Sequence, residues 1–475
     1  MSAVLNKALA ACLLAVGISG CMLGPNYKRP EVQAPQSFRF AEGEARDLAN
    51  TAWWEQFNDP ALNELIRTAL AENKDVKIAA ARVEEFMGRF ATTRSQLFPQ
   101  IFGNASATRE QLSRRSGVGQ LPGVDPKATI YDVNLSAAWE IDVWGRVRRL
   151  TEAARADLLA SEEGRRATIL TLVASVATGY VSLLDLDQRL ATVRATSTSR
   201  GESLRLFDLR FRNGVISELE LAQNRSEYED ALARIPPIES AIAQQENALS
   251  VLLGRNPGPI ARGTPLGALP LPGVPSGLPS DLLERRPDLR QAEQELIAAN
   301  ARIGAARALY FPTISLTGIF GSVSGQLSNL FSGSSKAWSY TGGATVPIFT
   351  AGGIAGVVKQ SEAQQQQALL GYQKTIQTSF REVEDALVSH QKVREQLAAQ
   401  ARQVDSLRRY ARLARLRYEG GFTSYIEVLD AERTLFDVEL GYVQTQGSVF
   451  ASLIDLYKAM GGGWVVTAER LTSAR

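Results

Sequence analysis

Cysteine and histidine, the residue types most used for nucleophilic and metal chemistry, occur only three times in this sequence of 475 residues. The cysteines are Cys12 and Cys21, and the one histidine is His390. A single histidine in a charged helical stretch cannot by itself build a catalytic dyad or a zinc site. Cys12 lies in an apolar stretch that we expect to be removed, so no disulfide can form within the mature chain. The sequence therefore predicts a protein that is not an enzyme and that uses no cofactor and no metal.

The residues that precede Cys21 indicate a role for this cysteine. The chain begins like a secretory signal, in which Lys7 precedes an apolar run at residues 8–16 and small residues follow. Residues 18–21 (ISGC) resemble a bacterial lipobox, whose cysteine becomes the N-terminus and carries acyl chains. Each buried acyl CH₂ group contributes roughly 0.8 kcal/mol, so several chains hold a protein on a membrane. We expect residues 1–20 to be a signal peptide and Cys21 to be lipidated; an ordinary signal with an incidental cysteine is the alternative.

The sequence also indicates in which membrane the protein lies and that nucleic acid is not its partner. Met22 follows the cysteine, where an aspartate would retain a lipoprotein at the inner membrane, so the resemblance to lipoproteins implies delivery to the outer membrane. Lys and Arg total 52 against 50 Asp and Glu, and no basic patch predicts a nucleic acid partner. Beyond the signal we expect no apolar stretch of about 18 residues and hence no transmembrane helix, which leaves β-strands as the way across a bilayer.

Two copies of one structural plan account for most of the chain. The segment LRFRNG at residues 209–214 returns as LRYEGG at 416–421, so Gly214 corresponds to Gly421. Between the copies, residues 256–279 are rich in proline and glycine and are predicted to be a linker. The predicted organisation is a lipid-anchored N-terminal segment (21–60), a first repeat (61–255), the linker (256–279), a second repeat (280–462) and a C-terminal tail (463–475).

Each copy is predicted to contain a helix that ends at a Phe-Pro pair, followed by two strands. Apolar and polar residues alternate in these strands: Leu135, Ala137 and Trp139 fall on one side of the pleat, and Asn134 and Ser136 on the other. Strands of about ten residues with this alternation suit a bilayer-crossing sheet, although a soluble sandwich would show the same pattern. The strands are expected at about 101–112, 129–143, 312–323 and 338–349.

Long helices are predicted after the strands of each copy. Segments 151–212 and 354–419 are dense in helix-forming residues without an interior proline, so each would extend roughly 90 Å. Return helices are expected over 217–253 and 424–460, with a break or kink in the first at Pro236-Pro237. Such helices must pack sideways on other helices. A coiled-coil tether is the alternative, but it does not account for the strands.

Four strands in one chain cannot close a transmembrane barrel. Small bacterial barrels need about eight strands, and open strand edges are not tolerated in lipid. Several chains must therefore share one barrel. Three copies would supply twelve strands, with the attached helices forming a second, helical tube around a continuous polar lumen.

Five motifs occur in order along the chain: GPNYKRP at 24–30, WW at 53–54, RPDL at 286–289, ARIG at 301–304 and the turn at 417–430. In their order and spacing they resemble the motifs of the TolC-like outer membrane factors, most closely those of the lipidated OprM/NodT-type branch in drug and metal efflux. The resemblance covers nearly all of the mature chain. It implies a mainly α protein with transmembrane β, in which a homotrimer forms a twelve-stranded outer membrane β-barrel, a long periplasmic α-helical barrel and an equatorial region.

The same resemblance implies partners and site residues. The partners would be a periplasmic adaptor (membrane fusion) protein, an inner membrane pump of the RND type and outer membrane lipid. Acidic residues ring the periplasmic mouth in this family, and the matching positions here are Glu427 and Asp430, three apart on one helical face. Arg417 and Tyr418 match positions that brace the closed mouth. An ordinary solvated helix face is the alternative for the two carboxylates.

The tips of the two helical hairpins are expected at Gly214 and Ser217 in the first copy and at Gly421 and Ser424 in the second. The glycines would serve as turn residues, and the adaptor would dock nearby. In the first copy Glu220 matches Glu427, but Gln223 replaces the second carboxylate, so this turn is expected to contribute less to gating.

The predicted function is a passive outer membrane exit duct of a tripartite efflux system, which exports small molecules such as drugs, toxic compounds or metal ions. A type I protein secretion channel and a non-pore, envelope-spanning helical tether are the alternatives. The lipobox favours efflux over secretion. The substrate is not predicted, because in such assemblies the pump selects it.

Overall fold

The computed structural model describes residues 22–32, 35–40, 51–113, 115, 125–274, 279–461 and 464–465. The predicted signal peptide, Cys21 and most of the predicted tail lie outside these residues. The chain divides into two compact units, each of which is described by itself. The first comprises residues 1–31, 83–161 and 292–372, and the second comprises residues 32–82, 162–291 and 373–475.

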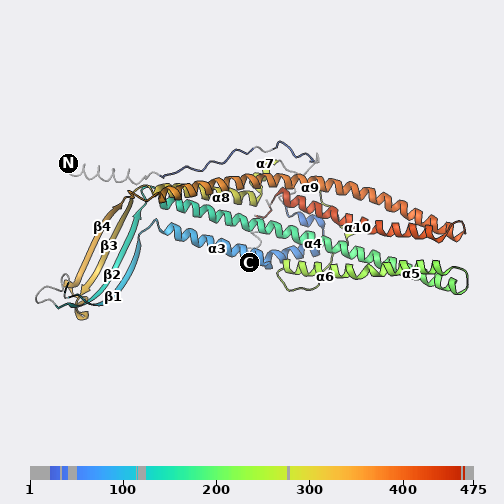
Figure 1. The fold of residues 1–475 in the computed structure, drawn as a ribbon, viewed down its shortest axis with the longest axis horizontal. Helices are drawn as coiled ribbons and strands as arrows, with labels where there is room; N and C mark the ends of the chain where they lie inside the picture. The colour runs from blue at the N-terminus through green and yellow to red at the C-terminus, as the bar shows by residue number, and fades with distance from the viewer. Residues whose placement is uncertain are drawn as a thin grey trace. The chain divides into compact units, whose positions relative to one another are not determined.

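The first unit contains a four-stranded antiparallel sheet in the order β1-β2-β3-β4, drawn as four adjacent arrows in Figure 1. Two of the expected strands end earlier than predicted, β2 at Ile141 and β4 at Thr345, so Val346 lies beyond the last strand. Strands β1 and β4 form the two edges. The bounds are β1 Gln100–Gln111, β2 Lys127–Ile141, β3 Thr313–Ser324 and β4 Lys336–Thr345.

The register of the sheet gathers apolar side chains onto one face. Leu135 is paired with Gly103 on one side and with Phe320 on the other, and Phe320 is paired with Trp338. Directly paired residues share a face of a sheet, so these side chains form one lateral row. Leu135, Phe320 and Trp338 are 57%, 63% and 67% exposed. The described part of the chain therefore leaves this apolar face without a cover.

The opposite face of the same sheet is largely polar. Asn104 donates hydrogen bonds to Asn134 Oδ1 at 3.1 Å and to Ser136 Oγ at 3.0 Å, which links β1 to β2 on this face. The sheet thus has one face suited to lipid and one suited to water.

The N-terminal segment 22–29 is bound to the helices of the first unit. The buried Arg149 on α4 (Arg146–Arg212) donates from Nε to the carbonyl oxygen of Leu23 at 3.0 Å and from Nη2 to Asn26 Oδ1 at 2.8 Å. On α8 (Pro287–Ala308), Glu293 accepts a hydrogen bond of 3.0 Å from the Tyr27 hydroxyl. These contacts fix the GPNYKRP motif beside the first unit's helices.

The core of the second unit forms around a buried carboxylate. Asp59 caps α2 (Pro60–Glu72) by accepting from the backbone N–H groups of Ala61 and Leu62 at 2.8 and 3.2 Å. Its second oxygen accepts from the Tyr180 hydroxyl at 2.8 Å and from Thr264 N at 3.0 Å. Burial raises the pKa of Tyr180, so this hydroxyl stays a donor. Asp59 thereby joins α2, α4 and the predicted linker.

Aromatic rings surround this node. Trp53 of η1 (Trp53–Phe57) stacks on Tyr457 with ring centroids 5.1 Å apart, and Trp54 meets Trp464 edge to face at 4.8 Å. These side chains belong to one buried cluster in the second unit. The WW motif therefore serves the core of that unit.

Long helices complete the fold, and α4 begins at Arg146, five residues earlier than expected. The return helix of the first copy is broken: α5 ends at Ala233 and α6 begins at Ile235, so Pro236 falls in the first turn of α6, where a missing N–H leaves no helical bond unmade. The remaining helices are α3 (Lys74–Ser95), α5 (Glu218–Ala233), α6 (Ile235–Leu252), α7 (Pro279–Arg285), α9 (Gly353–Glu419) and α10 (Tyr425–Met460); the short 3-10 helices are η3 (Leu266–Ala268), η4 (Leu327–Asn329) and η5 (Gly333–Ser335).

The expectation that no apolar stretch of about 18 residues follows the signal is wrong. Residues 167–184 of α4 carry no charge, and α4 is the one described helix that is long and apolar enough to cross a membrane. In the structure 61% of its most apolar window is buried. Ile169, Val173 and Leu183 there belong to the core of the second unit. A core helix passes the same test as a membrane helix, so this is weak evidence for a span.

Candidate gate at the helix turns

The two hairpin turns of the second unit have the same backbone. Gly214 and Gly421 have φ angles of 71° and 75°, in the left-handed region that favours glycine. The N–H after each glycine closes the preceding helix: Val215 donates to the carbonyl oxygen of Arg210 and Phe422 to that of Arg417, both at 2.9 Å. Both glycines therefore lie where the sequence places them, as turn residues.

A capping box starts the helix after the first turn. The Ser217 N–H donates to Glu220 Oε2 at 2.9 Å, and the Glu220 N–H donates to Ser217 Oγ at 3.3 Å. Ser424 occupies the equivalent position before α10 but makes no side-chain cap hydrogen bond in the described structure. The two turns thus share a backbone and differ in their side-chain bonds.

Ser217→Ala is expected to lower the free energy of local unfolding at the start of α5 by about 1 kcal/mol, since a cap hydrogen bond is lost. The matched change Ser424→Ala should cost less, because no such bond exists to be removed. Hydrogen exchange of peptides covering each turn measures the difference. Equal acceleration of exchange in both variants would contradict the asymmetry of the caps.

Glu427 and Asp430 both contact α9, the helix that leads into the second turn. Glu427 Oε1 lies 3.1 Å from Arg417 Nη1, and its other oxygen accepts from the Thr423 hydroxyl. Asp430 Oδ2 lies 3.4 Å from the Tyr410 hydroxyl, a long and weak hydrogen bond. The Arg417 side chain is 58% exposed, so the ion pair contributes little stability. The carboxylates are therefore held to one helix by bonds that are easily exchanged.

Tyr418 connects the two hairpins. Its ring stacks on Phe207 of α4 with centroids 6.4 Å apart and meets Tyr425 of α10 at 5.1 Å. Its hydroxyl lies 3.5 Å from Glu220 Oε1 in the first turn. Partial burial and the Glu220 carboxylate raise the pKa of this hydroxyl, which keeps it protonated. Tyr418 thus braces α9 against the first copy's hairpin.

A buried ion network lies behind the turns and was not predicted from the sequence. Arg200 of α4 is 3.1 Å from Glu227 of α5, both are nearly buried, and Arg433 of α10 also pairs with Glu227. Arg200 also lies over the Phe436 ring at 4.8 Å from its centroid. Positions so far apart in the chain leave no local pattern from which this network could be found.

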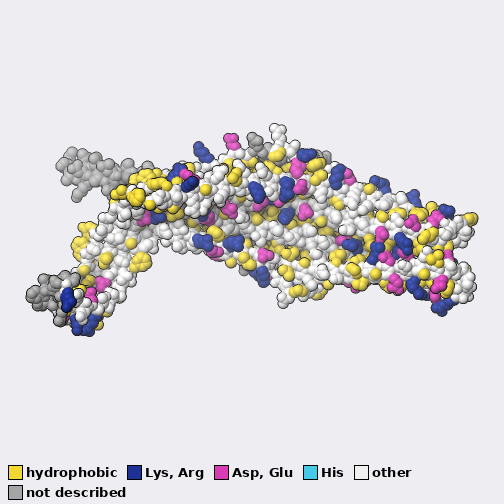
Figure 2. Space-filling view, viewed as in Figure 1, with side chains coloured by type: hydrophobic (Ala, Val, Ile, Leu, Met, Phe, Trp, Pro, Cys, Tyr) yellow, Lys and Arg dark blue, Asp and Glu magenta, His cyan; other side chains and the backbone are white. Residues whose placement is uncertain are grey.

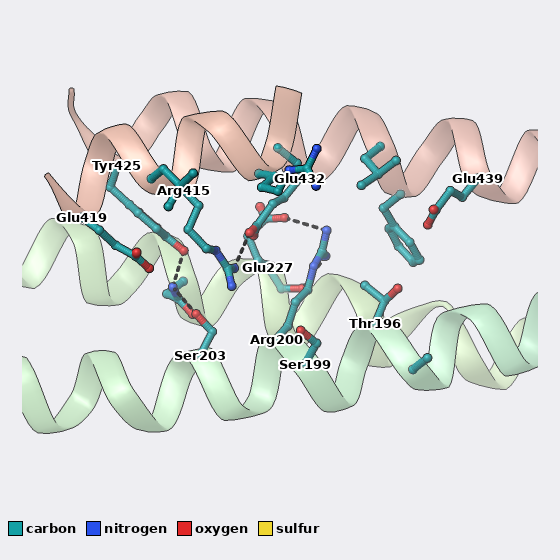
Figure 3. Close-up of a pocket in the computed structure, with 17 residues that line it drawn as sticks. Thr196, Ser199, Arg200, Ser203, Glu227, Arg415, Glu419, Tyr425, Glu432 and Glu439 are labelled. Atoms are coloured by element: carbon teal, nitrogen blue, oxygen red, sulfur yellow. Dashed lines mark hydrogen bonds and ion pairs between the residues drawn. The ribbon is translucent and has the colours of Figure 1, made fainter. Parts of the chain in front are cut away.

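Arg200 and Glu227 line a cavity of about 590 Å³, which Figure 3 shows, and Arg415 and Glu432 form a further ion pair there beside Tyr425. On the face drawn in Figure 2, basic and acidic side chains are intermixed over α4, α5, α9 and α10 near the turns.

The described residues offer no group of three or more His, Cys, Asp or Glu side chains that could hold a metal ion. His390 is buried, with Nδ1 3.0 Å from Ser452 Oγ, and it lies in the helical stretch expected from the sequence.

Comparison with known proteins fits this arrangement. The sequence profile of the family described as outer membrane efflux protein matches residues 65–255 and 278–462, one segment on each side of the Pro- and Gly-rich stretch. The chain is 38% identical over 465 residues to the probable efflux pump outer membrane protein TtgC of Pseudomonas putida, covering 96% of this chain and 95% of that one. It is 35% identical over 463 residues to the cation efflux system protein CusC of Escherichia coli, covering 96% and 99%.

A solved structure agrees. The open state of the MtrE outer membrane channel of Neisseria gonorrhoeae matches with a TM-score of 0.83 and 30% identity, covering 94% of this chain and 99% of that one. The predicted fold class, function and location are confirmed: the protein is the outer membrane exit channel of an efflux system and extends into the periplasm. Because the profile of this family matches most of the mature chain, the protein belongs to the outer membrane efflux protein family.

Proposed function

We propose that three copies of the chain share one twelve-stranded barrel and form a passive exit duct for small molecules. The observation that carries this proposal is the exposed apolar row of Leu135, Phe320 and Trp338 on a sheet with two open edges. A bilayer covers such a face, and neighbouring copies pair with such edges. The polar face around Asn104 and Asn134 then lines the lumen.

The duct catalyses no reaction, so it is not an enzyme. Since it has no energy source of its own, it works with partners that drive export. These are a periplasmic adaptor and an inner membrane pump of the RND type. The cargo is a small toxic compound or a metal ion, which is supported by relatives named for the efflux of toluene and of cations. A protein secretion channel and a helical tether are less well supported, because the relatives are efflux proteins and the sheet has a lipid-suited face.

We further propose that the chain is anchored by lipid at Cys21 and is built from two repeats. Cys21 carries the acyl chains, and the described segment that follows it is held by Arg149 and Glu293. Repeats at 61–255 and 280–462 are supported by the two matched profile segments and by the similar φ angles of the turn glycines, 71° at Gly214 and 75° at Gly421.

Single-particle imaging of the detergent-purified, lipidated protein tests the duct. Hollow cylinders with three-fold symmetry are expected. Solid rods or monomers would remove the shared barrel and favour the tether.

We expect Glu427 and Asp430 to form the gate at the periplasmic mouth. Glu427→Ala combined with Asp430→Ala should increase the single-channel conductance and lower the cation preference, because three chains lose six carboxylates around a narrow axis. Planar bilayer recording measures both. Asp405→Ala is the control, since this carboxylate is on α9, is well exposed and pairs with Arg409. A double variant that conducts like the control would exclude these residues from the gate.

A further inference from the structure

The two turns contain the same capping sequence but use it differently. A serine is followed three positions later by a glutamate in both, as Ser217 and Glu220 in the first and Ser424 and Glu427 in the second. The serine backbones are superimposable, with φ and ψ of −79° and 157° for Ser217 and −78° and 158° for Ser424. The second turn is therefore shaped for a capping box that its glutamate does not form.

The glutamate of the second turn is bound elsewhere. Glu220 accepts from the Ser217 N–H at 2.9 Å, whereas Glu427 accepts from Arg417 at 3.1 Å and from the Thr423 hydroxyl. The Glu427 N–H donates to the backbone oxygen of Ser424 at 3.2 Å and not to the Ser424 hydroxyl, so neither of the two capping-box bonds is made at this turn.

The two turns differ at several positions, and one of these differences adds a side-chain donor to the glutamate of the second turn. An arginine precedes both turns, as Arg210 and Arg417, so the arginine alone does not draw the glutamate away. Thr423 corresponds to Ile216, which has no hydroxyl and whose side chain packs against the apolar cluster of the tip. In the first turn the Ser217 hydroxyl donates to Glu220 at 3.1 Å from within the capping box, whereas the Thr423 hydroxyl donates to Glu427 from the residue before the cap.

From this we propose that Thr423 is the positioning residue of the gate, since its hydroxyl holds the Glu427 carboxylate with Arg417 and away from the cap of α10. Without that hydroxyl, Glu427 takes the role that Glu220 has and binds the Ser424 N–H. This inference rests on the proposed place of Glu427 at the mouth.

The two arrangements are close enough in free energy for one hydroxyl to decide between them. An exposed ion pair and a capping hydrogen bond stabilise proteins by similar, small amounts. A hydrogen bond from a hydroxyl to a carboxylate adds a contribution of at least that size. Removing the Thr423 hydroxyl is therefore sufficient to reverse the preference.

The test compares Thr423→Val, which is nearly isosteric, with Thr423→Ser, which retains the hydroxyl. In planar bilayers Thr423→Val is expected to lower the cation-to-anion permeability ratio by about fivefold at most, the factor that corresponds to one such bond. Thr423→Ser should behave like the wild type. In the assembled protein, hydrogen exchange of a peptide spanning 422–428 should slow in Thr423→Val, because the Ser424 N–H gains an acceptor.

Ile216→Val in the first turn is the matched control and should change neither readout. Thr423→Ala replaces Thr423→Val if the latter does not assemble. Wild-type permeability and exchange in Thr423→Val, with an altered permeability in Glu427→Ala, would refute the role of Thr423 and leave the gate intact. A change in Thr423→Ser equal to that in Thr423→Val would also refute it. Wild-type permeability in Glu427→Ala would instead remove the gate itself.

Discussion

Replacing Leu135 with arginine is expected to abolish assembly of the protein in the outer membrane. Leu135 is on β2, one of the two inner strands, in the row that pairs it with Phe320 and continues to Trp338. This face is apolar and exposed within the chain, so lipid must cover it. An arginine on the lipid face of a barrel costs about 2–4 kcal/mol near the bilayer midplane, and a trimer incurs this cost three times.

Ser339→Arg is the control for this prediction. Ser339 is adjacent to Trp338 on β4, at nearly the same level of the sheet, and its side chain is on the opposite, largely polar face. An arginine there meets water in the lumen, so assembly should be retained. Heat-resistant trimers in the outer membrane fraction, detected by electrophoresis without boiling, measure the outcome. Equal assembly of the two variants would show that the lipid face has been assigned incorrectly.

The second large effect is expected for Asp59→Ala, which should destabilise the core of the second unit by about 3–5 kcal/mol. The carboxylate is fully buried and accepts from Ala61 N, Leu62 N, Tyr180 and Thr264 N at 2.8 to 3.2 Å. Each buried donor left without an acceptor costs about 1–3 kcal/mol. A loss of this size is exceptional for one substitution and is a large fraction of the stability of a domain.

A graded series makes the prediction specific. Tyr180→Phe removes one of the four hydrogen bonds to Asp59 and also the bond of 2.8 Å that the Gly263 N–H donates to the hydroxyl, so it should cost about half as much. Since membrane proteins often unfold irreversibly, the half-life of the trimer at a fixed temperature is the appropriate measure. Tyr180→Phe as harmful as Asp59→Ala would indicate that the hydroxyl packing, rather than the buried carboxylate, stabilises this node.

Local pattern was sufficient for much of the fold. Alternation at Leu135, Ala137 and Trp139 identifies a strand with one apolar face, because side chains of a strand point to alternate sides whatever they pack against. Composition and the absence of interior proline identify the two 67-residue helices. The repeated serine and glutamate spacing after Gly214 and Gly421 locates both turns. These features depend on residues that are close together in the sequence, so the sequence is sufficient to predict them.

Contacts, ion pairs and hydrogen bonds between residues far apart in the chain could be identified only from the tertiary structure. Residues 167–184 are apolar enough for a membrane, and only the packing of Trp53 and Tyr457 in the same core shows that protein covers them. Nothing in the sequence distinguishes Arg200 and Glu227 from the other charged residues, and only the packing of α4 against α5 shows that they form an ion pair. Glu427 could be predicted from the sequence to follow the second turn, but its hydrogen bond with Thr423 instead of Ser424 could not.

The sequence by itself determined which segments are strands, helices and turns, because those choices follow from side-chain spacing and backbone preference. The tertiary structure alone decided which polar groups satisfy one another, since capping, ion pairing and burial compete within about 1 kcal/mol and the outcome depends on what lies within hydrogen-bond reach.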